Sequence, residues 1–129
     1  EGGHLHWRNL AEEGWADFLD ELVEDIPTRA VWLTIDKDAL AEADAATNWD
    51  QGGLPLEHLL AAIEHLAGAR EIAGVDICGD WSRPRFSDPF RAALAWFDHP
   101  RRPEPQPAAL ARNAAVNAIL IDCFQRVLP

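Results

Sequence analysis

Ala30-Val-Trp-Leu-Thr-Ile-Asp36 is the stretch of sequence that decides the fold. It is short, almost wholly apolar and rich in β-branched and aromatic residues, which is typical of a parallel strand buried on both faces. A second run of this kind occupies residues 71–78, and residues 56–66 between the two carry apolar side chains at helical spacing. A strand, a crossover helix and another strand predict a right-handed parallel βαβ unit.

Further helices are expected before and after this unit, because apolar residues again recur every three to four positions. They are residues 10–26, which Pro27 ends, a short helix at 89–97 and a long helix at 108–128. The loop from 37 to 53 is expected to hold at most one helical turn, at 39–46, and residues 4–7 are a candidate strand. This order predicts an α/β fold, half of a three-layer α/β/α domain with a mostly parallel sheet.

Composition narrows the class of protein. A chain of 129 residues that is 48% hydrophobic and 26% charged has the size of one globular domain at most. Its net charge of −11 would repel nucleic acid and anionic membrane surfaces, and no apolar stretch approaches the ~20 residues that span a bilayer. Cys78 and Cys123 are too few for a disulfide framework, so a cytoplasmic setting is expected. Because the sequence lacks Met, we interpret it as a trimmed or incompletely represented chain.

Asp36 and Asp38 are the most informative polar residues, since they follow a predicted strand at the sheet edge where open α/β sheets bind ligands. If the strand continued, side chains at i and i+2 would share a face, with Cα atoms about 7 Å apart. Two carboxylates placed so need protons, hydrogen-bond donors or cations, and a pair of divalent metal ions meets that need. Spacing alone, however, favours an ordinary role in capping a helix or forming a turn.

Three segments carry a family resemblance: Val31-Trp-Leu-Thr-Ile-Asp-Lys-Asp-Ala-Leu40, Ala46-Thr-Asn-Trp-Asp-Gln-Gly-Gly-Leu54 and Gly74-Val-Asp-Ile77. They resemble the signature of the ureohydrolase family, which includes arginase, agmatinase and formimidoglutamase. In that family a strand ending S-x-D-x-D-x-x-D-P leads to a loop closing on Gly-Gly-Leu, then to a helix and a strand reading G-x-D-I-x-E. The similarity covers residues 10–124, and it implies that residues 1–129 are the C-terminal half of one arginase-like domain.

The resemblance implies a dinuclear manganese site with two Mn²⁺ ions, in which Asp36 bridges the ions and Asp38 ligates one of them. The sequence also departs from the family pattern. The departures are Lys37 between the two ligands, Ala41 and Glu42 in place of Asp-Pro, and Gly79 in place of the Glu that contacts the substrate guanidinium. The family's remaining His and Asp ligands, from a Gly-Gly-Asp-His loop and a D-x-H-x-D motif, have no match, since Gly2-Gly3-His4 lacks the Asp.

Three residues are candidates for binding the substrate. Asp80 follows Gly79 and would face away in a continuing strand, so it reaches the site only if a bulge or turn re-aims it. Trp49 and Trp81 fall in loops at the strand-end edge, where they are expected to line a pocket. The remaining tryptophans lie on apolar stripes and are expected in the core; they are Trp7, Trp15, Trp32 and Trp96.

From the resemblance we expect a metal-dependent hydrolase that cleaves a C–N bond in a small guanidine, amidine or amide. This chain alone cannot complete such a site, so the expected partners are the N-terminal half of the same domain or further copies in a homo-oligomer. Because Gly79 has no side chain, arginine is not expected to be a good substrate. The alternative is a catalytically inactive arginase-like fragment or pseudoenzyme that acts as a structural or interaction module.

Overall fold

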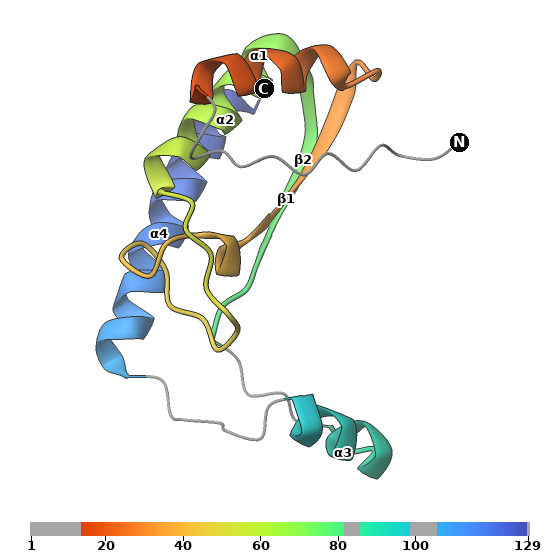
Figure 1. Cartoon of the computed structure of the whole chain (residues 1–129), viewed down its shortest axis with the longest axis vertical. Helices are drawn as coiled ribbons and strands as arrows, with labels where there is room; N and C mark the ends of the chain where they lie inside the picture. The colour runs from red at the N-terminus through yellow and green to blue at the C-terminus, as the bar shows by residue number, and fades with distance from the viewer. Residues whose placement is uncertain (1–13, 82–85, 99–105, 129) are drawn as a thin grey trace.

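Two parallel strands form the sheet of the computed structural model, which describes residues 14–81, 86–98 and 106–128 (Figure 1). β1 (Ala30–Asp36) pairs with β2 (Glu71–Cys78), and α2 (Leu56–Ala69) crosses over between them. The register runs from Ala30 opposite Glu71 to Asp36 opposite Cys78, so the carboxyl ends of both strands lie at one edge. The predicted parallel βαβ unit and the α/β fold class are confirmed.

In the described ranges three more α-helices accompany this unit: α1 (Trp15–Asp25), α3 (Pro89–Asp98) and α4 (Pro107–Val127). α4 begins at a proline, where the missing N–H leaves no intrahelical hydrogen bond unmade. The prediction of a helical turn at 39–46 is wrong in its position, because the turn that forms is a 3-10 turn, η1 (Lys37–Ala39), directly after β1. The candidate strand at 4–7 and the start of the helix expected at 10–26 lie outside the described residues.

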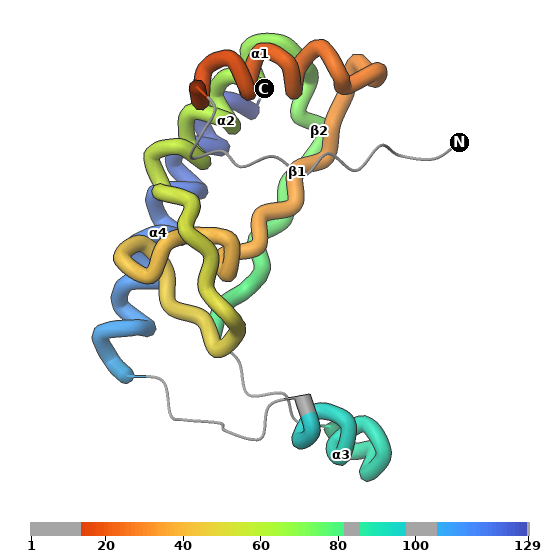
Figure 2. Tube along the Cα trace, in the orientation of Figure 1, coloured from red at the N-terminus to blue at the C-terminus, as the bar shows by residue number. Residues whose placement is uncertain are grey.

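The hydrophobic core lies between one face of the sheet and the helices α2 and α4 (Figures 1 and 2). We call this face the inner face. Its buried cluster consists of Ile35, Leu40, Ala45, Ile63, Val116, Leu120, Cys123 and Phe124. Leu110 and Ile121 on α4 are about half exposed, because the buried stripe of this helix is phased on Asn113, Val116 and Cys123.

The opposite, outer face of the sheet is open in the described structure. Trp32 is 63% exposed, and Thr34 is also exposed, so the expectation of a strand buried on both faces is wrong for these residues. Trp32 Nε1 and Thr34 Oγ1 both donate to Asp76 Oδ2, at 2.8 and 3.1 Å, across the two strands. The indole lies over Gly74, where a Cβ would come within 2.7 Å of Trp32 Cε3. This face is therefore polar and aromatic rather than apolar.

The other tryptophans expected in the core differ from one another. Trp15 is partly buried and stacks on His58 with ring centroids 5.0 Å apart, which joins α1 to α2. Trp96 is more than half exposed on α3, so its core placement is wrong. Trp7 lies outside the described residues.

α3 stands apart from the other elements, beyond the carboxyl ends of the strands (Figures 1 and 2). Its apolar side chains Phe90, Leu94 and Phe97 fall on one stripe, four and three residues apart, and all are more than half exposed. None of the helices in the described ranges combines the length and hydrophobicity that a membrane span requires.

Candidate functional site

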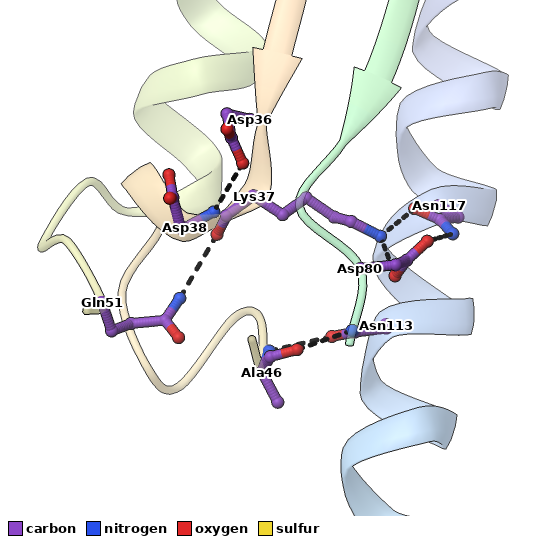
Figure 3. A network of polar contacts seen from close by, with 8 residues as sticks. All are labelled: Asp36, Lys37, Asp38, Ala46, Gln51, Asp80, Asn113 and Asn117. Carbon is purple, nitrogen blue, oxygen red and sulfur yellow. Dashed lines mark hydrogen bonds and ion pairs between the residues drawn. The ribbon is translucent and has the colours of Figure 1, made fainter. Parts of the chain in front are cut away.

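Asp36 and Asp38 meet in the tight turn that follows β1. Asp36 is the last strand residue, and its Oδ1 accepts a hydrogen bond from the backbone N–H of Asp38 at 3.3 Å, so it caps η1 (Figure 3). Asp38 therefore leaves the strand instead of continuing along its face. Burial raises the pKa of Asp38, and the charge and hydrogen bonding of Asp36 raise it further. The two carboxylates thus influence each other directly, and the capping role weighed from the sequence is present as well.

The Gly-Gly-Leu segment holds this turn from the other side. Gly52 N donates to Asp38 O at 2.6 Å and Leu54 N donates to Ala39 O at 3.1 Å. Only glycine fits at position 52, since a Cβ there would lie within 2.7 Å of the carbonyl carbon of Ala39. Gln51 adds a side-chain amide that donates to Lys37 O and to the Leu40 carbonyl oxygen, at 3.3 and 2.8 Å. The turn carrying the two Asp residues is therefore fixed by the end of the long loop.

The far part of the same loop is anchored to helices. Asn113 on α4 brackets Ala46, accepting from its N–H at 2.8 Å and donating to its carbonyl at 2.7 Å. Asp44 Oδ2 accepts from the backbone N–H of Leu56 at 2.9 Å, which satisfies a free donor at the start of α2. The long loop between β1 and α2 is thus an ordered structure.

Lys37 lies between the two Asp residues but points the opposite way, into the inner face. Its side chain is 0% exposed, and its Nζ forms an ion pair with Asp80 and donates to Asn117 Oδ1 at 2.8 Å (Figure 3). Asn117 Nδ2 approaches the other Asp80 oxygen at 3.4 Å, which closes the three residues into a ring. Burial pushes the pKa of Asp80 upward, but hydrogen bonds from Lys37 and Asn117 and the charge of Lys37 outweigh it and bring it below its ordinary value.

Gly79 makes the turn between β2 and Asp80. Its φ of +80° is in the left-handed region that favours glycine. A Cβ at this position would overlap Asp36 Oδ1 and lie 2.7 Å from Lys37 N, so the end of β1 occupies the space of a side chain here. A turn that changes the direction of the Asp80 side chain is therefore present. It directs the Asp80 carboxylate toward Lys37, at the end of β1, and toward Asn117, on α4 (Figure 3).

The two loop tryptophans are placed differently. Trp49 is half exposed on the rim of an open polar hollow of about 340 Å³, whose lining includes Thr47, Gln51 and Arg112. Trp81 is partly buried directly after Asp80 and is not part of that lining. Gln51 connects the hollow to the turn after β1 through its bond to Lys37 O.

Sequence reasoning missed the polar residues that hold this region together: Lys37 as a buried cation, Gln51, Asn113 and Asn117. Asn113 and Asn117 lie one helical turn apart within the buried side of α4, and such asparagines in an apolar stripe indicate buried hydrogen bonds. That signal could have pointed to α4 as a partner of the strand ends.

The described residues include side chains of the type that binds manganese, but too few of them to complete a manganese site. Carboxylate oxygens are ligands that Mn²⁺ prefers, and the raised pKa of Asp38 beside Asp36 is the electrostatic situation that a bound cation relieves. Within the described ranges, no group of three or more His, Cys, Asp and Glu residues is close enough to hold a metal ion. Asp36 and Asp38 would therefore supply two ligands of a larger set.

Comparison with known proteins identifies the relationship. The family model described as "Arginase family" matches residues 3–79, which is more than half of the 129 residues and includes both strands, α2 and the turn with Asp36 and Asp38. Neither the curated proteins nor the solved structures searched gave a match. On the family match, together with the parallel βαβ unit, the chain belongs to the arginase family.

Proposed function

We propose that this chain supplies the Asp36–Asp38 turn to the dinuclear manganese site of a hydrolase that cleaves a C–N bond in a small guanidine, amidine or amide. The observation that carries the proposal is the turn at the carboxyl end of a parallel strand in an arginase-family chain, where the Asp38 N–H donates to the Asp36 carboxylate. Ligands of open α/β sheets bind at that edge. When bound, the manganese ions would supply positive charge that makes water acidic near neutral pH.

The residues around the turn have separate tasks in this proposal. Asp36 and Asp38 hold the metal, and a cation is favoured there because burial, and after it the charge of Asp36, raises the pKa of Asp38. Gln51 and Gly52 keep the turn rigid through bonds to its carbonyl groups. A rigid turn matters because ligands must be held in position before the metal arrives. Trp49 and Trp81 would line the approach for the substrate.

We further propose that the site is completed by residues from the N-terminal half of the same domain or from another copy of the chain. Two carboxylates leave most coordination positions of two metal ions unfilled. The open outer face of the sheet, with Trp32 63% exposed, supports a missing layer. Among the described residues no strand pairs with the outer edges of β1 and β2, which supports additional strands there.

Metal analysis tests the proposed site. The full-length protein, expressed with Mn²⁺ and dialysed, should retain close to two manganese ions, and Asp36→Asn or Asp38→Asn should remove at least one. Asp76→Asn is the matched control, because Asp76 lies on the same sheet but its carboxylate accepts bonds from Trp32 and Thr34. Manganese at background level in the unsubstituted protein would contradict the proposal and favour the inactive interaction module.

Light scattering tests the proposed completion. The 129-residue chain, with a mass of 14.3 kDa, should associate with further copies when it is alone and with the N-terminal half when that half is added. On its own it should bind Mn²⁺ weakly. A stable 14.3 kDa monomer that unfolds cooperatively would contradict the idea that this is half of a domain.

A further inference from the structure

The buried ammonium group of Lys37 is the least expected feature of the strand-end region. A charge removed from water is tolerated only when it is paired and hydrogen-bonded, and Lys37 has both a carboxylate partner in Asp80 and an amide partner in Asn117. The three residues come from the end of β1, the turn after β2, and α4. The cluster therefore fixes where the chain goes after β2.

The same cluster decides where the Asp80 carboxylate points. Figure 3 shows Asp36 and Asp38 at one end of the Lys37 side chain and Asp80 with Asn117 at the other. Gly79, directly before Asp80, has no side chain and no room for one beside Asp36. Of the two residues that leave β2 at this edge, one offers no carboxylate and the other offers one that is already paired.

The next carboxylate along β2 is also occupied. Asp76 Oδ2 accepts hydrogen bonds from both Trp32 and Thr34, and it lies on the outer face two residues before the strand end. If Asp36 and Asp38 are taken by metal, neither β2 nor the turn after it presents a free carboxylate beside them. A cationic head group needs such a partner, because a charge-assisted hydrogen bond is what orients it and offsets its loss of hydration.

We infer that the Lys37–Asp80 ion pair, supported by Asn117, is a specificity determinant that withholds the Asp80 carboxylate from the strand-end site and so selects uncharged amide or urea-type groups over guanidinium cations. The inference rests on the proposed hydrolase function for its substrate class. The arrangement itself rests on the contacts of Lys37. The Asp80 carboxylate then makes no contact with the substrate, and Lys37 is a positioning residue that holds this carboxylate away from the site.

Two ligands of the same shape and different head-group charge provide the probe. They are 4-guanidinobutyrate, with a cationic guanidinium, and 4-ureidobutyrate, with a neutral urea. Their Kd values are measured by calorimetry on the Mn²⁺-loaded full-length protein, so the readout does not depend on turnover. The unsubstituted protein should bind the ureido compound more tightly. Lys37→Met, which keeps the length of the side chain and frees Asp80, should shift the ratio of Kd values toward the guanidino compound by about tenfold, the weight of one charge-assisted hydrogen bond.

Three further variants decide between interpretations. Lys37→Arg retains the cation and should leave the ratio within about twofold of the starting value, and Lys37→Met with Asp80→Asn should cancel the shift. Asp80→Asn alone is expected to fold, because the new amide oxygen and Asn117 Oδ1 can still accept hydrogen bonds from Lys37 and the Asp80 side chain is 53% exposed, and it should leave guanidino affinity within about twofold. It therefore tests the inference even if Lys37→Met does not fold.

The outcomes separate this inference from the proposed function. A tenfold loss of guanidino affinity in Asp80→Asn, or no shift in a folded Lys37→Met, would overturn the inference and leave the hydrolase proposal standing. The predicted shift without any turnover of either compound would support the inference and refute the hydrolase. Failure of every variant to bind either ligand would overturn both.

Discussion

The two faces of the β1–β2 sheet place alternate residues of the same strand in opposite surroundings. On the inner face Ile35 is buried against α2 and α4, and Lys37 continues that row as a fully buried cation. On the outer face Thr34 and Asp36 are exposed. The alternation of a strand therefore continues for one residue past its end, and it separates two tasks. The outer row leaves the Asp36 carboxylate exposed, and the inner row uses the charge of Lys37 to hold the structure.

The largest expected difference between the faces is in stability. Ile35→Ala should lower the free energy of unfolding by about 2–5 kcal/mol, because it leaves a cavity in the core cluster. Thr34→Ala should cost no more than about 1 kcal/mol, the value of its exposed hydrogen bond to Asp76. Urea titration of both variants measures the contrast. Equal losses would indicate that the layer proposed to complete the domain already covers the outer face in solution.

The turn after β2 provides a second contrast between a crowded and an open glycine. Gly79→Ala should destabilise the protein by about 1–3 kcal/mol, since φ is +80° and a Cβ would overlap the Asp36 carboxylate. Gly53→Ala is the matched control in the neighbouring loop, because a Cβ at position 53 meets no atom within 4 Å.

A second measurement on the same pair follows the metal. In the full-length protein the Gly79→Ala variant should bind Mn²⁺ more weakly, because the new Cβ displaces Asp36. The Gly53→Ala variant should bind Mn²⁺ about as tightly as the unsubstituted protein. Identical stabilities and identical metal affinities in the two variants would show that Asp36 does not occupy the space beside Gly79.

The sequence predicts the inner face better than the outer one. The apolar runs at β1 and β2 gave the strands and their parallel pairing, because a crossover through α2 leaves few other topologies. An almost unbroken apolar run does not reveal whether one face of the sheet or both faces are covered, because the covering layers come from other segments of the fold. Trp32 was therefore placed in the core and is exposed.

The candidate site was predictable in its composition and less so in its geometry. The Asp36–Asp38 spacing suggested two carboxylates on one face of a strand, but a local cap takes Asp38 out of the strand. The pairing of Lys37 with Asp80 joins residues 43 positions apart, and it depends on the strand register and on the turn at Gly79. Their contact with Asn117 depends also on the rotational phase of α4.

The reactivity of the two cysteine thiols provides a further comparison of the two faces of the sheet. Cys78 is exposed at the end of β2, and partial desolvation of its thiol by the surrounding chain, followed by the charge and hydrogen bonding of Asp36, raises its pKa. Since thiolate is the reactive form, Cys78 should react with iodoacetamide more slowly than a free thiol at the same pH. Asp36→Asn should accelerate the reaction roughly twofold or more, because the pKa then falls toward its ordinary value.

Cys123 is the internal control, because it is buried in the core cluster and its thiol should react only after unfolding. Mass spectrometry of the two cysteine-containing peptides over time separates their rates. Labelling of Cys123 as fast as Cys78 in folded protein would show that the inner face is open. An unchanged Cys78 rate in Asp36→Asn would show that the Asp36 charge does not reach the thiol.

The smallest expected effect is the acid dependence of the Lys37–Asp80 pair. Burial alone would raise the pKa of Asp80, but the hydrogen bonds from Lys37 and Asn117 and the charge of Lys37 lower it below the ordinary 3.8. The folded state therefore binds fewer protons at Asp80 than the unfolded state, and the resulting stability is present above pH 3.8 and lost as the pH falls through the lowered value. The stability deficit of Asp80→Asn should accordingly be constant near neutral pH and shrink below 3.8. Because the Asp80 side chain is 53% exposed, solvent screens the pair and the deficit should be modest. Urea unfolding of both proteins between about pH 6 and about pH 2.5 measures it. A deficit that stays constant across that range would show that Asp80 carries no lowered pKa, and that Lys37 is held by Asn117 and by packing rather than by the carboxylate.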